Sequence, residues 1–137
     1  MNKKIITSSF SETENLGIEF SKELVPGDIV LLYGDLGSGK TTFVKGVLKG
    51  LKYNHDVTSP TFSLINEYDA NHDVIHIDCY REKNVDRWIN LGINDYFNSA
   101  NIVIIEWPEI LEEIIENRVI KIKIDHLDEY KREISFI

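Results

Sequence analysis

The chain has 137 residues, of which 42% are hydrophobic and 28% charged, a composition typical of a globular protein rather than a disordered or fibrous one. Its 15 basic and 23 acidic residues leave a net charge of -8, which argues against free-standing nucleic-acid binding, because Lys and Arg supply most of that affinity. A chain of this length predicts a single domain over residues 1–137. No apolar run approaches the ~20 residues that cross a bilayer, so we expect no membrane span. Cys79 is the one cysteine, which favours the reducing cytoplasm.

The first part of the chain predicts two helices on either side of a buried strand. Residues 3–7 have the composition of a short edge strand, and Ser11 has the capping-box spacing that would begin a helix over residues 12–24. Residues 28–33 form an apolar run of the length of a buried parallel strand. A glycine-rich turn follows directly, and residues 41–51 then place apolar side chains at helical spacing.

The rest of the chain predicts further strands separated by turns and short helices. Two β-prone segments, residues 62–68 and 74–80, are separated by a polar stretch that suits a hairpin loop. Residues 84–97 have the pattern of one or two short helices broken near Gly92. The remaining expected elements are a buried strand over residues 101–107, a helix from 108 to about 117, a strand with one wet face over 119–125, and a strand over 132–137 that pairs beside it.

The glycine-rich turn carries the strongest signal in the chain. Residues 34–41 read Gly-Asp-Leu-Gly-Ser-Gly-Lys-Thr and match the phosphate-binding loop pattern G-x-x-x-x-G-K-[ST]. Between a strand and a helix, such a loop directs backbone N–H groups and the helix N-terminus at one point, where they favour a polyanion. Lys40 would then reach the β- and γ-phosphates, and the Thr41 hydroxyl would bind Mg²⁺.

With this loop, the predicted fold is α/β: a three-layer sandwich like that of P-loop NTPases, with a mixed sheet that has a parallel centre and antiparallel edge hairpins. Adenine nucleotide is the favoured ligand, because the D-x-x-G and N-K-x-D patterns of GTPases are missing from the sequence. The loop residues expected to bind it are Leu36, Gly37, Ser38, Gly39, Lys40, Thr41 and Thr42.

Two of the predicted strands carry a carboxylate at their carboxyl ends. Glu106 follows an apolar strand, as in a Walker B segment with Glu instead of the usual Asp, and Asp78 follows a more polar one. In an open α/β sheet both ends would point to the edge where phosphates lie. We therefore expect both carboxylates to belong to the phosphate site, with Glu106 in the position of a metal-holding residue, the alternative for each being a solvated carboxylate at a strand end.

For each of four other residues the sequence allows both a functional and a structural interpretation. Thr61 could act as a switch threonine whose hydroxyl meets Mg²⁺ and the γ-phosphate, or belong to a turn that begins at a proline. Trp107 could lie near the nucleotide or in the core. Arg81 could stabilise charge or form a surface ion pair. His76 alternates with Asp78 on one strand face, and we expect it to be a structural histidine.

Several blocks of residues resemble, in order and spacing, the bacterial TsaE (YjeE) family of ATPases. The Ser-Pro-Thr-Phe and Glu-Trp-Pro blocks together are specific to this family, whereas the phosphate loop is shared by many. The resemblance runs from about residue 13 to residue 132. The blocks are the phosphate loop extended to residue 43, Ser-Pro-Thr-Phe-Ser-Leu-Ile-Asn-Glu-Tyr at 59–68, His-Ile-Asp-Cys-Tyr-Arg at 76–81, Leu-Gly-Ile at 91–93, Asp-Tyr-Phe at 95–97 and Glu-Trp-Pro-Glu at 106–109.

The resemblance implies a Mg²⁺-dependent ATPase that is needed for threonylcarbamoyladenosine formation at position 37 of tRNAs reading codons that begin with A. It implies TsaB and TsaD as partners, ATP turnover that resets their complex, and contact with tRNA only through them. By motif it assigns Walker A roles to Lys40 and Thr41, the metal role to Glu106, catalytic roles to Asp78 and Thr61, and nucleotide contacts to Arg132 and to the stretch from Ser8 to Phe10. A nucleotide-gated binding module without turnover and a small-molecule kinase stay open as alternatives.

Overall fold

The computed structural model describes residues 3–57 and 63–137. In this part of the chain seven strands form one sheet of order β1-β7-β6-β2-β5-β4-β3. The strands are β1 (Lys3–Thr7), β2 (Ile29–Tyr33), β3 (Ile65–Asp69), β4 (Asp73–Asp78), β5 (Ile102–Glu106), β6 (Val119–His126) and β7 (Arg132–Phe136).

The sheet is parallel at its centre and antiparallel toward both edges. β2 pairs in parallel with β5 and β6, and β4 pairs in parallel with β5. Antiparallel pairing joins β3 to β4 at one side and joins β6 to β7 and β7 to β1 at the other. The mixed sheet expected from the sequence is therefore confirmed.

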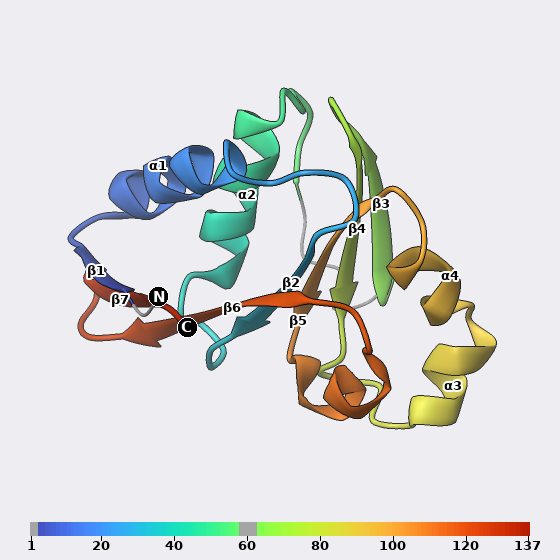
Figure 1. Cartoon of the computed structure of the whole chain (residues 1–137). Helices are drawn as coiled ribbons and strands as arrows, with labels where there is room; N and C mark the ends of the chain where they lie inside the picture. Colours follow the sequence, from blue (N-terminus) through green and yellow to red (C-terminus); the bar gives the residue numbers. More distant parts are fainter. Residues whose placement is uncertain (1–2, 58–62) are drawn as a thin grey trace.

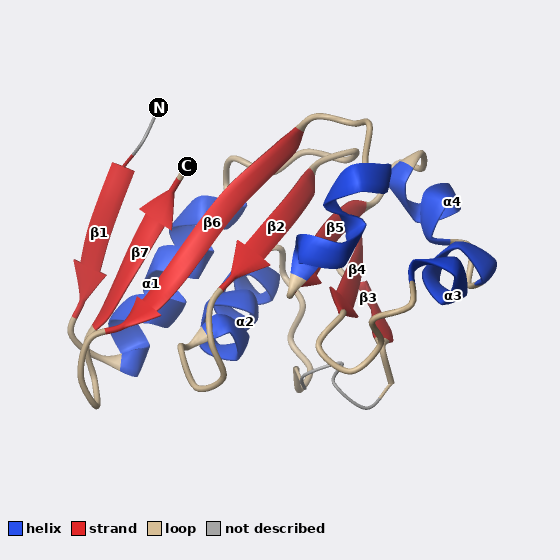
Figure 2. Cartoon of the chain, turned by 90° about the horizontal axis from the view of Figure 1, so that it is seen from below, coloured by secondary structure: helices blue, strands red, loops and turns tan. Residues whose placement is uncertain are grey.

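Helices cover both faces of this sheet. They are α1 (Phe10–Ser21), α2 (Lys40–Gly50), α3 (Val85–Asn90), α4 (Ile93–Phe97) and a 3₁₀ helix, η1 (Pro108–Ile114). α1 and α2 lie on one face, and α3, α4 and η1 lie on the other (Figures 1 and 2). No helix within residues 3–57 and 63–137 has the length and apolar character needed to cross a membrane.

Strand β2 shows why the fold has three layers. Its side chains alternate between two hydrophobic clusters: Val30 and Leu32 pack with α1 and α2, whereas Ile29 and Leu31 pack with residues such as Trp88 of α3. A run of apolar residues without a polar face is expected of a strand that is covered on both sides. The predicted three-layer arrangement is confirmed.

Helix α1 begins two residues before its predicted start. Its N-cap is Ser9, whose Oγ accepts a hydrogen bond from the backbone N–H of Glu12 at 3.1 Å, while Oε1 of Glu12 accepts from the backbone N–H of Ser8 at 2.9 Å. The expectation that Ser11 caps the helix was wrong. Capping at Ser9 leaves Thr13 on the buried side of α1, where its hydroxyl contacts that of Thr7 at 2.7 Å.

Other elements differ from the sequence-based expectation mainly in their limits. The segment after Pro108 forms the 3₁₀ helix η1 rather than an α-helix, and it ends at Ile114. β4 ends at Asp78, two residues early. The break near Gly92 is confirmed: Gly92 has a φ of 84° and separates α3 from α4, a backbone conformation that glycine adopts without steric cost.

The packing of α1 against α2 depends on glycine and yields a first prediction. A Cβ at Gly46 would lie 2.0 Å from the backbone oxygen of Glu14, so an added methyl group must push the two helices apart. We expect Gly46→Ala to lower the free energy of unfolding by about 1–3 kcal/mol, although alanine is intrinsically the better helix former. Urea denaturation of the chain measures this change.

The control is Lys45→Ala, at the exposed neighbouring position of α2, which should change the free energy of unfolding by no more than about 0.5 kcal/mol. A Gly46→Ala chain as stable as the parent would show that the two helices can separate without cost.

Candidate functional site

The loop between β2 and α2 turns sharply and places its backbone at the start of α2. Gly37 and Gly39 have φ values of 77° and 106°, which other residues rarely adopt. Gly39 is the N-cap of α2, and no side chain within the described residues caps the helix there. The N–H groups of the first helical turn are thus available to an anion.

A cleft of about 290 Å³ opens over this loop, at the carboxyl ends of β2, β4 and β5. Its walls contain all the predicted site residues except Thr61 and Ser8. Thr61 lies outside the described residues, and the structure does not place Ser8 in the lining of the cleft. The lining residues are Phe10, Leu36, Gly37, Ser38, Gly39, Lys40, Thr41, Thr42, Asp78, Glu106, Trp107 and Arg132.

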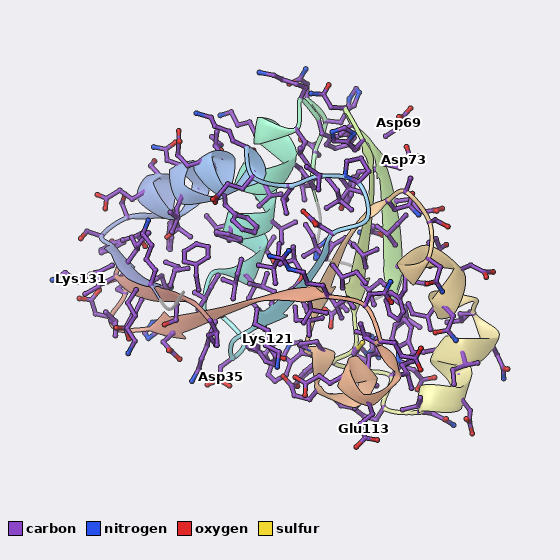
Figure 3. The ribbon with its side chains drawn as sticks, in the orientation of Figure 1. Asp35, Asp69, Asp73, Glu113, Lys121 and Lys131 are labelled. Carbon is purple, nitrogen blue, oxygen red and sulfur yellow. The ribbon has the colours of Figure 1, made fainter. Side chains whose placement is uncertain are left out.

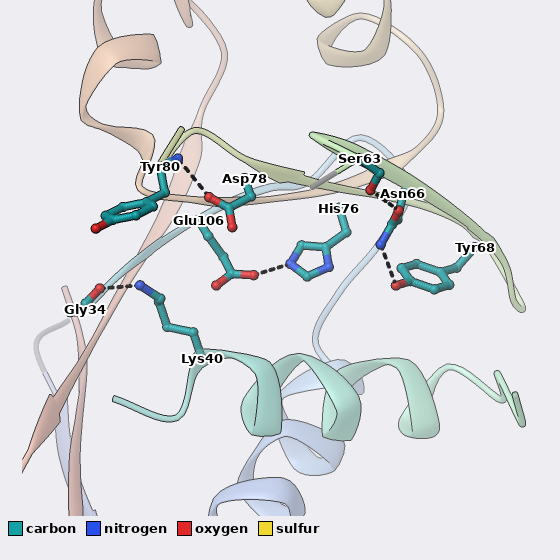
Figure 4. A network of polar contacts seen from close by, with 9 residues as sticks. All are labelled: Gly34, Lys40, Ser63, Asn66, Tyr68, His76, Asp78, Tyr80 and Glu106. Atoms are coloured by element: carbon teal, nitrogen blue, oxygen red, sulfur yellow. Dashed lines mark hydrogen bonds and ion pairs between the residues drawn. The ribbon is translucent and has the colours of Figure 1, made fainter. Parts of the chain in front are cut away.

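The two predicted carboxylates lie next to each other. The pairing of β4 with β5 puts Asp78 opposite Glu106, and both residues are only 3% exposed. Oδ1 of Asp78 accepts a hydrogen bond from the backbone N–H of Tyr80 at 2.8 Å. Figure 4 shows both carboxylates between the sheet and the start of α2, on the side where Lys40 projects.

A further contact was not expected from the sequence as part of the site. Nε2 of His76 lies 2.6 Å from Oε2 of Glu106, and both side chains are buried. The alternation of His76 with Asp78 on one face of β4 was visible in the sequence. The contact with Glu106 was not, because it depends on which strand pairs with β4.

Lys40 is held in the cleft by contacts with the loop and with an aromatic ring. Its ammonium group donates to the backbone oxygen of Gly34 and lies 4.1 Å from the ring centroid of Trp107. Burial lowers the pKa of Lys40, and the nearby carboxylates of Glu106 and Asp78 act in the opposite direction. A partly desolvated ammonium group of this kind interacts strongly with an anion that enters the cleft.

Trp107 adopts an unusual backbone conformation. Its φ of 54° lies in the left-handed region, which bulky residues rarely occupy and which tends to occur at functional sites. This conformation sets the indole ring beside Lys40 and 4.9 Å from the ring of Tyr80. Trp107 therefore lines the cleft and also packs against one of the hydrophobic clusters of the core.

Arg132 approaches the loop from β7, at the far end of the chain. Its guanidinium donates to the backbone oxygens of Asp128 at 2.7 Å and of Gly37 at 3.4 Å, and it lies 5.7 Å from the ring centroid of Phe10. Arg132 is 5% exposed. In contrast, Asp35 in the glycine-rich loop between β2 and α2 is exposed and points to solvent (Figure 3). The cleft is thus lined by two buried cations, Lys40 and Arg132.

Comparison with known proteins identifies the chain's relatives. Residues 7–134 match the model of a family described as threonylcarbamoyl adenosine biosynthesis protein TsaE. Proteins named tRNA threonylcarbamoyladenosine biosynthesis protein TsaE are similar over most of the chain. The Rickettsia felis protein is 37% identical over 97% of this chain and 78% of its own length, and the Bacillus subtilis protein is 40% identical over 81% and 70%.

A solved structure agrees with the sequence comparison. The crystal structure of Bacillus subtilis YdiB superposes with a TM-score of 0.85 at 33% sequence identity, covering 99% of this chain and 84% of that one. The agreement extends over the whole sheet and its helices, since nearly all of the chain takes part in it.

Proposed function

The chain belongs to the TsaE family, and from that premise we propose that it binds ATP with Mg²⁺ in the cleft at the start of α2 and hydrolyses it as part of tRNA threonylcarbamoyladenosine biosynthesis. One observation carries the proposal: a single cleft combines the glycine-rich loop, Lys40 and two adjacent carboxylates, Asp78 and Glu106. Phosphoryl transfer needs these parts, namely a cradle for the phosphates, a cation, a metal-binding carboxylate and a group that orients the nucleophile.

The residues in the cleft fit a bound nucleotide and metal. Oγ of Ser38 and Nε of Arg132 are buried and have no hydrogen-bond partner among the described residues, an arrangement that phosphate oxygens would complete. The Thr41 hydroxyl and the Glu106 carboxylate are hard oxygen ligands of the kind Mg²⁺ prefers, and Mg²⁺ commonly takes one or two protein ligands together with substrate phosphates.

In the proposed reaction each residue has a distinct part. Lys40 and the loop N–H groups bind the β- and γ-phosphates and stabilise the charge on the transferred group. Glu106 and Thr41 would hold Mg²⁺, which neutralises charge on the phosphates when it is bound. Asp78, directly opposite Glu106 on the neighbouring strand, would orient the attacking water. Phe10 and Leu36, at the edge of the cleft, would contact the base, and Arg132 the nucleotide.

We also propose that TsaB and TsaD are the partners of this chain in the cytoplasm, and that ATP turnover resets their complex between rounds of tRNA modification. Phosphate release, measured for the chain alone and again with both partners, tests this. We expect slow release alone and faster release in the assembly. ATP binding without release in either sample would favour a nucleotide-gated binding module, and phosphate transfer to a small molecule would favour a kinase.

The net charge yields a second prediction. At a net charge of -8, the chain alone repels a polyanion. We therefore expect it to bind tRNA no more tightly than non-specific contacts do, which have a Kd of about 10⁻⁴–10⁻⁶ M at physiological salt. A filter-binding titration with tRNA measures this, with the three-protein assembly as the positive control. Submicromolar binding by the chain alone, weakening steeply as salt is raised, would instead indicate direct contact with RNA.

A further inference from the structure

A buried histidine reaches the carboxylate that we propose to hold the metal. His76 has no exposed surface, and its Nε2 lies 2.6 Å from Oε2 of Glu106. In the sheet register, Asp78 is paired with Glu106 and His76 with Ile104. Because side chains alternate along a strand, His76 and Asp78 project from the same face of β4. Glu106 is therefore approached by Asp78 from directly across and by His76 from the diagonal position.

The contacts of the histidine ring indicate where its proton lies. A carboxylate only accepts hydrogen bonds, so the proton between the two groups is on Nε2 of His76. The other ring nitrogen, Nδ1, is also buried and has no hydrogen-bond partner among residues 3–57 and 63–137. In the contact with Glu106, Nε2 of His76 is therefore the donor and the Glu106 carboxylate the acceptor.

The position of the ring is set by the neighbouring strand. The ring of Tyr68 on β3 lies 6.4 Å from that of His76, and Tyr68 is itself buried. The Tyr68 hydroxyl accepts a hydrogen bond from the Asn66 amide at 3.2 Å, and Oδ1 of Asn66 accepts one from Ser63 at 2.7 Å (Figure 4). This polar chain holds the aromatic ring that packs beside His76.

We propose that His76 is a positioning residue for Glu106: its Nε2–H group holds one carboxylate oxygen and so keeps the other directed at the metal position in the cleft. This inference rests on the proposed metal role of Glu106. His76 does not line the cleft and acts only through Glu106. Partners that orient a metal-binding side chain in this way typically contribute 10–100-fold to metal affinity or activity.

Two amide substitutions at this position separate the hydrogen bond from the packing. In His76→Gln the amide nitrogen can occupy the place of Nε2 and still donate to Glu106. In His76→Asn a polar amide of similar character is too short to reach. The ATP affinity of each variant and of the parent is measured by calorimetry in excess Mg²⁺ and again in EDTA, and the ratio gives the affinity that Mg²⁺ contributes.

We expect His76→Asn to reduce the Mg²⁺ contribution about tenfold or more while affinity in EDTA is unchanged, and His76→Gln to stay within about threefold of the parent. Equal Mg²⁺ contributions in all three chains would overturn the proposal. Loss of the cooperative thermal transition in both variants would also overturn it, because His76 would then serve the fold. A parent chain that binds ATP without any gain from Mg²⁺ would instead overturn the proposed metal site, and this inference with it.

Discussion

Replacement of Lys40 by alanine is expected to weaken ATP binding by about 2–5 kcal/mol, the usual effect of truncating one partner of a buried, hydrogen-bonded charge pair, and to abolish turnover. Lys40 is 6% exposed and faces the carboxylates of Asp78 and Glu106 across the cleft. Without its ammonium group these two negative charges would repel the phosphates instead of being balanced. Calorimetry with ATP and a phosphate-release assay measure the two effects.

The matched control for this change is Lys45→Ala. It removes the same charge from the same helix, but at an exposed position, so it should leave both ATP affinity and turnover close to those of the parent. A Lys40→Ala chain that binds and hydrolyses ATP like the parent would contradict the assignment of the loop as a phosphate site. Equal losses in both variants would mean that net charge, rather than the cleft, determines binding.

Replacement of Glu106 by glutamine is expected to remove most of the Mg²⁺ dependence of ATP binding and to lower turnover about 10²-fold or more, a size typical for the loss of one preorganised charge-stabilising group. The amide keeps the shape of the side chain, and its oxygen can still accept the hydrogen bond from His76. What it loses is the negative charge that would attract Mg²⁺. Turnover measured over a range of Mg²⁺ concentrations reports both effects.

Glu113→Gln is the matched control for this second change, because Glu113 is an exposed carboxylate further along the chain. It should alter neither the Mg²⁺ dependence nor the rate. If Glu106→Gln retained both, the metal role would pass to Asp78, which is paired with Glu106 across β4 and β5, and Asp78→Asn would then be the variant that loses them.

The features that the sequence by itself determined are those that depend on the local order of residues. The glycine spacing of residues 34–41 predicted a strand, loop and helix, because a tight turn around phosphate needs residues without a Cβ. The apolar run of β2 predicted a strand covered on both faces. The carboxylates at the ends of two strands, Asp78 and Glu106, were predicted to meet at one edge of a parallel sheet.

Only the tertiary structure decided the contacts between segments that are distant in sequence. Arg132 reaches the backbone oxygen of Gly37 because β6, which pairs with β7, also pairs with β2, and His76 reaches Glu106 because β4 pairs with β5. Such pairings depend on how whole strands are ordered in the sheet, which periodicity along the chain does not encode. The start of α1 at Ser9 also brings Thr13 into contact with Thr7, a contact between two elements that the local spacing of residues does not contain.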